Sequence, residues 1–365
     1  MKKTLIAMAV MSVAGATFAQ ATLYGVIDAS LGSRKVEAAG ALAATASEPG
    51  TNINSSVNSG ARWGLRGSED LGGGLKANFQ LESGFSVDTG ASAQGGLLFG
   101  RTAKVGVSGG FGSIDMGRIL AIKDTSTWAV TGGYANYAAW GNTVDNGTTF
   151  GNPSGTIAAP VRRNNSILYT SPAMSGLSAQ IMYQPGENGV GGATPAGATS
   201  YTGLGLGYAA GPMSANLSYE SSKAAPGAGV ASAAPAATVA GLAAGVDLTE
   251  TAVSATYDFG IAKLAASYIK GSKAGAAGGD DTGYALGLTA PVGVVNVAAE
   301  YARVSTTLAS GADGGKASAL NVRVSYPLSK RSDVYGYYMS GESNGVAAAD
   351  TQKVTQYQLG LRHTF

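Results

Sequence analysis

The sequence contains no cysteine and only one histidine, His363. Without cysteine the chain cannot form disulfides, and one histidine is too few for a cysteine-histidine metal cluster. His363 is also the only residue that could act as the histidine base of a serine hydrolase. His363 alternates with Leu361 and Phe365 on one apolar face, where a ring at an interface is expected rather than a base. We therefore predict that the protein is not an enzyme and needs no metal or cofactor.

Long apolar runs are absent beyond the N-terminus, and charged residues make up only 13% of the chain. A helix that crosses a bilayer needs about 20 consecutive apolar residues, so membrane-spanning helices are excluded. No segment after the N-terminus keeps a 3.6-residue apolar period for long. The 56 glycines and 17 tyrosines, with sparse leucine, favour an all-β chain in one domain.

The first residues have the pattern of an export signal. Lys2 and Lys3 precede an apolar stretch at 5–16, and Ala19 provides a small residue for cleavage. We expect residues 1–19 to be a signal peptide and residues 20–365 to form the mature domain. Without the two lysines the 24 basic residues become 22, equal to the 22 acidic residues. A neutral chain argues against nucleic acid as a partner.

Residues 62–85, RWGLRGSEDLGGGLKANFQLESGF, predict two strands joined by a tight turn. Leu75, Phe79 and Leu81 alternate with polar residues, which places the apolar groups on one face. Strands of this length reach the roughly 9 to 11 residues that a tilted strand needs to cross a bilayer. Sixteen segments can form strands: 21–31, 60–69, 74–86, 100–109, 112–118, 162–172, 176–184, 200–210, 212–222, 248–259, 262–271, 282–291, 293–305, 316–327, 332–341 and 354–365.

Short turns and long polar loops alternate between these segments, with both ends of the chain on the short-turn side. In hydrocarbon every backbone donor and acceptor must be paired, so a sheet spans a membrane only when it closes on itself. We therefore predict a 16-stranded antiparallel transmembrane β-barrel with apolar outer and wet inner faces. In residues 320–326, for example, Leu320 and Val324 are expected outside, and Asn321 and Arg323 inside.

The chain resembles the general porins of Gram-negative outer membranes, of the β-proteobacterial type. The matching motifs are ATLYGVID at 21–28, WGLRGSEDLGGGLK at 63–76, FGRTAKVG at 99–106, MGR at 116–118, RRNNSILYTSP at 162–172 and YQLGLRHTF at 357–365. The resemblance implies a passive diffusion channel for ions and small hydrophilic solutes, located in the outer membrane as a homotrimer. It also implies contact with outer-membrane lipid and lipopolysaccharide, and insertion by the barrel-assembly machinery, whose signal Phe365 resembles.

The longest connection, residues 119–161, is too long for an ordinary loop unless it has a function. In porins the equivalent loop folds inward and narrows the pore, so the resemblance implies an inward-folded constriction loop here. It also implies a basic wall of Arg62, Arg101 and Arg162 with Glu82 nearby. Arg101 has the wrong parity relative to Val105, so it faces inward only from a bulge or from the loop end of its strand.

Facing within the strands adds candidates for the constriction. The inward positions of the strands carry Arg62, Arg66, Lys76, Glu82, Lys104 and Arg162. The loop side is expected to carry Asp115, Lys123, Asp124 and Asp145.

Ion preference in such a channel follows local charge, because a ring of like charge concentrates counter-ions within a Debye length of roughly 8 Å. If basic residues outnumber acidic ones at the narrowest point, the pore prefers anions, which is our hypothesis. Two alternatives use the same barrel. One is a substrate-specific channel, and the other is a surface receptor or adhesin that binds through the loops at 32–59, 223–247 and 306–315.

Overall fold

The computed structural model describes residues 21–40, 43, 46–125, 162–186, 199–224, 247–274, 279–345 and 350–365. Most of these residues are in β-strands, and no helix among them is long and apolar enough to cross a membrane. A short helical turn, α2 (Ala93–Gly96), lies between the fourth and fifth strands. The strands are β1 (Thr22–Ala39), β2 (Ser47–Ser55), β3 (Arg62–Gly72), β4 (Leu75–Gly84), β5 (Thr102–Gly109), β6 (Gly112–Leu120), β7 (Arg162–Thr170), β8 (Leu177–Gln184), β9 (Thr199–Ala210), β10 (Met213–Ala224), β11 (Asp247–Asp258), β12 (Lys263–Lys273), β13 (Gly279–Val292), β14 (Val295–Leu308), β15 (Asp313–Pro327), β16 (Ser332–Asn344) and β17 (Thr351–Thr364).

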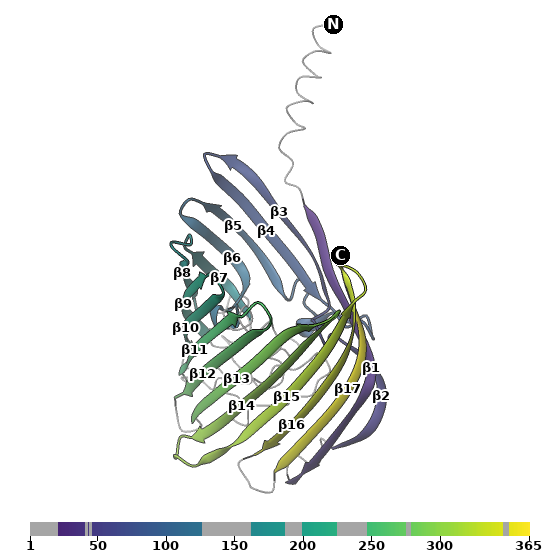
Figure 1. The fold of residues 1–365 in the computed structure, drawn as a ribbon. Coiled ribbons are helices and arrows are strands. Elements are labelled where there is room, and N and C mark those ends of the chain that lie inside the picture. The colour runs from purple at the N-terminus through teal and green to yellow at the C-terminus, as the bar shows by residue number, and fades with distance from the viewer. Residues whose placement is uncertain are drawn as a thin grey trace, which may run out of the picture.

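These strands form one closed antiparallel sheet (Figure 1). Closure comes from β1 and β17, which pair from Val26 opposite Thr364 to Ala39 opposite Thr351. The last residue extends this contact, because Gly25 and Phe365 exchange two backbone hydrogen bonds of 3.1 Å. The sheet therefore has no free edge, as the predicted barrel requires.

The barrel wall has sixteen strands although the sheet has seventeen segments. Both β2 and β3 pair with β1, β2 opposite residues 29–36 and β3 opposite residues 22–26. The two segments are therefore successive parts of one wall strand, interrupted at residues 56–61. This count agrees with the predicted 16-stranded barrel.

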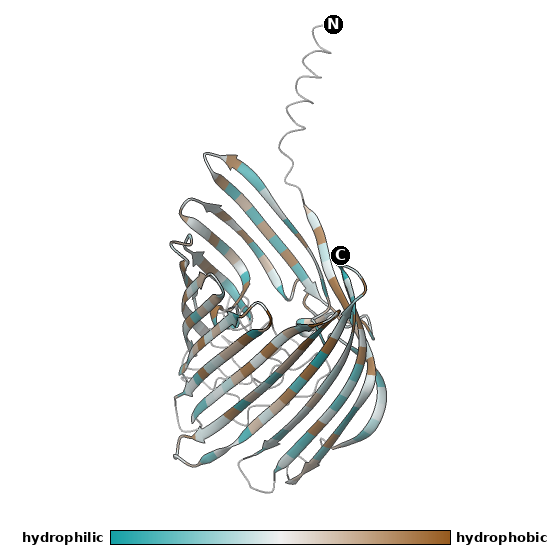
Figure 2. Ribbon diagram, in the orientation of Figure 1, coloured by the Kyte–Doolittle hydropathy of each residue, from teal (hydrophilic) through white to brown (hydrophobic). Residues whose placement is uncertain are grey.

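Side chains alternate between the two faces of the wall, and Figure 2 shows the resulting bands of hydrophilic and hydrophobic residues along the strands. In β15, Leu320 and Val324 are 40% and 42% exposed on the outer face. Asn321 and Arg323, which lie between them, are only 7% and 9% exposed because they face the interior. The alternation predicted for residues 320–326 is thus confirmed.

The connections at one end of the barrel are tight turns. Between β3 and β4 the Asp70 carboxylate accepts the Gly72 N–H at 2.8 Å, and residues 72–74 all have positive φ, which glycine adopts without strain. The opposite end carries longer connections, but two of them are shorter than the sequence predicted. Strand β1 continues to Ala39, and only residues 309–312 separate β14 from β15.

The strands extend further than expected because hydrogen bonding continues after the apolar alternation stops. In β1 the outward residues change from Leu23, Ile27 and Leu31 to Lys35 and Glu37, but the ladder to β17 persists. Sequence patterning detects the apolar face of a strand and does not detect a polar continuation.

Candidate functional site

The inner wall of β1, β3 and β4 carries an ionic cluster centred on Glu82. Glu82 Oε1 accepts a hydrogen bond from Arg101 Nε at 2.7 Å, and its Oε2 lies 3.7 Å from Arg62 Nε. Tyr24 on β1 donates its hydroxyl to the same carboxylate at 3.0 Å. The cluster forms because Tyr24, Gly64 and Glu82 are cross-strand neighbours on one face. One carboxylate therefore fixes two guanidinium groups on the inner wall.

Arg101 reaches this cluster from just before β5, which begins at Thr102. Its backbone N–H donates to the Glu82 carbonyl at 3.1 Å, which attaches the residue before β5 to the backbone of β4. Because Arg101 lies before the first residue of β5, its side chain is not bound by the alternation within the strand and can face inward.

Arg162 joins the same group through the backbone. Its Nε donates to the Arg101 carbonyl at 2.7 Å. The three arginines named by the resemblance, Arg62, Arg101 and Arg162, therefore form one connected set around Glu82. With three guanidinium groups and one carboxylate, this set has a local excess of positive charge.

Other predicted residues lie at different depths of the wall. The Arg66 guanidinium stacks on the Tyr24 ring, 4.9 Å from its centroid, next to the Glu82 cluster. Lys76 of β4 is the cross-strand neighbour of Asp70 of β3, beside the tight turn. It is six residues from Glu82 along β4, roughly 20 Å at about 3.3 Å per residue. Lys76 therefore lies at the mouth of the barrel and does not belong to the cluster.

Lys104 and Asp115 form an ion pair of 3.1 Å between β5 and β6. Asp115 was expected on the loop side, but it lies within β6 and is part of the wall, which corrects that assignment. The reason is that Asp115 occupies an inward position of β6, between Ile114 and Met116 on the outer face, and the predicted strand 112–118 already included it. Asp145 lies outside the described residues.

The chain turns to the inner side of the barrel after β6. Residues 122–125 are helical, and Ile122 packs in a buried cluster with Leu168, Met182 and Tyr201, which face inward from β7, β8 and β9. The beginning of the 119–161 connection therefore lies against the inner wall. Its continuation, residues 126–161, lies outside the described residues.

Lys123 is anchored on β10 and β11. Its N–H donates to Glu220 Oε1 at 2.7 Å, and its Nζ donates to Glu250 Oε1 at 2.9 Å. Burial lowers the pKa of Lys123, but the charges of Glu250, Asp124 and Glu220 outweigh this effect and hold the pKa above its usual value. Lys123 is thus a cation held by acidic side chains of β10 and β11.

Asp124 is buried beside Lys123 and has electrostatic contacts with Glu220 and Arg163. Burial raises the pKa of Asp124 to about 6, although the neighbouring positive charge of Lys123 opposes the shift. This carboxylate therefore titrates near neutral pH, whereas an exposed aspartate does so near 4.

Four residues around Lys123 and Asp124 were not predicted as site residues: Arg163, Tyr201, Glu220 and Glu250. The Arg163 guanidinium stacks over the Tyr201 ring, 3.9 Å from the centroid, and lies 3.7 Å from Glu220. The sequence could have predicted the two glutamates from the alternation of side chains. Glu220 and Glu250 occupy inward positions of strands whose outward positions hold apolar residues, namely Leu217, Tyr219 and Val253. The alternation of side chains could not predict the direction of Arg163, because Asn165 has a φ of +50° and this irregularity interrupts the alternation in β7.

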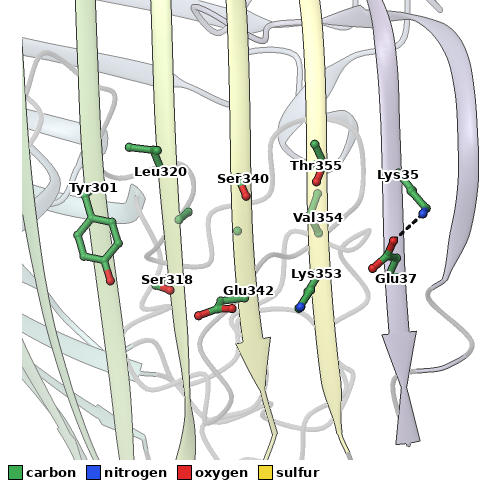
Figure 3. A pocket seen from close by; sticks show the side chains of 12 residues that line it. Lys35, Glu37, Tyr301, Ser318, Leu320, Ser340, Glu342, Lys353, Val354 and Thr355 are labelled. Carbon is green, nitrogen blue, oxygen red and sulfur yellow. Dashed lines mark hydrogen bonds and ion pairs between the residues drawn. The ribbon is translucent and has the colours of Figure 1, made fainter.

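A pocket of about 340 Å³ lies on the outer surface, across β14 to β17 and β1 (Figure 3). Lys35 and Glu37 face each other there at 2.5 Å, and Glu342 is the cross-strand neighbour of Lys353. Because these charges are of both signs and face away from the interior, the pocket does not belong to the channel.

A closed sixteen-stranded sheet with an apolar outer face, a charged inner face and a chain segment turned inward is the architecture of a membrane channel. The chain belongs to the Gram-negative porin family, whose model matches residues 4–346. It is 33% identical to outer membrane porin protein 32 of Delftia acidovorans over 391 residues, with all of both chains covered. It is 32% identical to an outer membrane porin protein of Bordetella pertussis over 415 residues, again with full coverage.

Among solved structures, the fold is similar to an anion-selective porin from Comamonas acidovorans. The TM-score is 0.72 and the identity 26%, with 95% of this chain and all of that chain covered. The protein is therefore an outer-membrane porin that lets ions and small hydrophilic solutes diffuse across the membrane.

Proposed function

We propose that this porin prefers anions and that the Glu82 cluster is the narrow region where the preference arises. The observation that carries the proposal is the connected set of Arg62, Arg101 and Arg162 around one carboxylate. The Arg62 and Arg101 guanidinium groups contact the same carboxylate, and Arg162 contacts the Arg101 backbone, so the positive charges are close enough to act together on a passing ion at physiological salt, where the Debye length is roughly 8 Å. The anion-selective porin of Comamonas acidovorans, which has a similar fold, supports the same direction.

The inward-turned chain after β6 supplies the other side of the proposed constriction. Lys123 and Asp124 lie there, and Arg66 and the Lys104–Asp115 pair line the wall next to the arginines. Charges of opposite sign on facing walls order water across the pore, which disfavours apolar solutes more than polar ones. We therefore expect a general filter for small hydrophilic solutes.

The experiment is a planar-bilayer measurement of the reversal potential under a KCl gradient. The double variant Arg62→Ala, Arg162→Ala should shift the reversal potential toward cation preference relative to the unmodified protein. Lys270→Ala is a matched control, because Lys270 lies on the outer face and is about half exposed. An unchanged ion preference in the double variant would exclude the arginine set as the source of selectivity.

We also propose a homotrimer, which follows from the family. Stepwise closure of one inserted unit in three equal decrements would support three channels per assembly. A purified protein whose mass in detergent corresponds to one chain, with single-step closures, would contradict it.

A substrate-specific channel is the alternative on the same barrel. Such channels commonly offer a track of aromatic rings to the solute. Of the inner tyrosines that the structure describes, Tyr24 is hydrogen-bonded to Glu82, Tyr335 to Asp28 and Tyr337 to Asn321, and the Tyr201 ring is covered by the Arg163 guanidinium. These rings are used to position polar wall residues, which favours the general channel.

A further inference from the structure

The wall strand made of β2 and β3 is interrupted by six residues, 56–61, which we call the inner segment. Ser55 pairs with Ala29 of β1, and Arg62 pairs with Val26. Six residues therefore stand opposite only two residues of β1, Ile27 and Asp28. Because a strand ladder places one residue opposite one, the inner segment cannot lie in the plane of the wall.

The contacts of the inner segment show that it projects inward. It binds Asp28 and Arg323, which are 0% and 9% exposed, and Asp28 also accepts the hydroxyl of Tyr335, which is 1% exposed. Their strand neighbours Ile27 and Val324 are outward and about 40% exposed. The segment thus extends over the inner face of β1 to side chains of β16 and β15.

Asp28 holds the inner segment in place. Its Oδ2 accepts the N–H groups of Asn58, at 2.9 Å, and of Ser59, while its Oδ1 accepts the Tyr335 hydroxyl at 2.6 Å. The Asp28 carbonyl accepts the N–H of Ser56 at 2.9 Å. Hydrogen bonds from several donors to one carboxylate are strong and directional, so this side chain fixes the course of the segment.

The inner segment in turn contacts two arginines on different parts of the wall. The Gly60 carbonyl accepts Arg62 Nη1 at 2.8 Å, beside the Glu82 cluster. The Asn58 carboxamide oxygen accepts Arg323 Nη1, from β15. The segment therefore connects the Arg62 side of the lumen with a basic residue that sequence reasoning did not include in the constriction.

We propose that residues 56–61 form a second narrowing segment of the channel, that Arg323 extends its basic wall, and that Asp28 is the positioning residue for both. The inference rests on the proposed anion-preferring channel and adds a further element that selects small anions. It places selectivity on two inward segments, one after β2 and one after β6.

The first test uses Asn58→Cys, because the natural chain contains no cysteine and the new thiol is unique. A negatively charged methanethiosulfonate reagent is added to single channels in a bilayer. The expected result is a fall in conductance of roughly 20% or more together with a weaker anion preference, since the new charge stands in the ion path. A positively charged reagent should strengthen the anion preference instead.

Ser310→Cys is the control, because Ser310 is exposed in the turn between β14 and β15. It should react without any change in conductance. Two results would overturn the inference: Asn58→Cys that reacts with no change, or Asn58→Cys that no reagent reaches. Absence of channels from the unmodified protein would instead contradict the proposed function itself.

Two further variants test the named residues. Arg323→Gln should shift the reversal potential toward cations, and an unchanged value would remove Arg323 from the basic wall. Asp28→Asn should increase single-channel conductance and weaken anion preference, because the segment loses its anchor. Asp28→Asn channels with unchanged selectivity and conductance would show that Asp28 has a structural role only.

Discussion

Lys123 and Glu250 are 127 positions apart in the sequence, yet Lys123 Nζ lies 2.9 Å from Glu250 Oε1 inside the barrel. Both side chains are nearly inaccessible, with 6% and 1% exposure. The pair therefore attaches the chain after β6 to the inner face of β11. A buried ion pair contributes little net stability, but removal of one partner leaves an uncompensated charge.

Replacement of Lys123 by Gln should destabilise the folded barrel by about 3 kcal/mol or more, because Glu250 would remain buried without its cation. Denaturant unfolding in detergent measures this cost. Lys270→Gln is the matched control, since Lys270 and Asp280 form an exposed pair of 3.5 Å, for which we expect less than about 1 kcal/mol. Equal costs for the two variants would show that the inner pair is solvated. A Lys123→Gln, Glu250→Gln double variant should recover part of the loss.

Removal of the acid from the arginine set should act in the opposite direction to removal of an arginine. Glu82→Gln leaves Arg62 and Arg101 without their carboxylate, so the local positive charge rises and anion preference should increase. The reversal potential under a KCl gradient reports the change. Glu342→Gln, on the outer face in the pocket of Figure 3, should leave it unaltered. A shift toward cations in Glu82→Gln would contradict the charge assignment.

Asp124 should make the ion preference depend on pH. Because its pKa is raised to about 6, it is largely ionised at pH 7.5 and largely neutral at pH 5. Loss of this negative charge on acidification should increase anion preference. Asp124→Asn should already show the acidic behaviour at pH 7.5, and the difference between the two proteins should vanish at pH 5. If the difference persists at pH 5, the titrating group is another carboxylate.

Closure of the barrel should depend on the absence of a side chain at residue 25. A Cβ on Gly25 would lie 2.3 Å from the Phe365 ring and 2.7 Å from the Arg62 carbonyl oxygen. Gly25→Ala should therefore destabilise the barrel by about 1–3 kcal/mol through overpacking. Gly336→Ala is the control, because a Cβ there would meet nothing within 4 Å. The measurement is the temperature at which the folded form is lost on an unboiled detergent gel; a similar decrease in both variants would contradict the role of the contact.

The architecture was predictable because the bilayer restricts what a spanning sheet can be. Alternation at positions such as Leu320 and Asn321 identified the wall, and the need for closure gave an even number of strands. The interruption between β2 and β3 was not predictable, because residues 52–60, NINSSVNSG, have the composition of an ordinary exposed loop. Only the pairing of residues 52–55 with β1 shows that the wall strand begins before the interruption.

The site was predictable to the extent that side-chain direction follows the strand period. This explains the placement of Arg62, Glu82 and Lys104, all of which lie within regular ladders. It does not explain Arg163, which precedes the bulge at Asn165, or the contact of Lys123 with Glu250, which depends on the course of the chain after β6. Long-range contacts of this kind leave no periodic signal in a single sequence.

The hydrogen bonds between Gly25 and Phe365 bring the first and last strands together, so the order of the strands around the barrel does not depend on where the chain begins. A circularly permuted chain, with residues 21 and 365 joined and new ends opened at residues 309–312, retains every strand pair of the original. Its last strand would then be β14, which ends at Leu308 where the natural chain ends at Phe365. Such a protein can fold to the same closed sheet although a different strand, β14 in place of β17, forms the end of the chain.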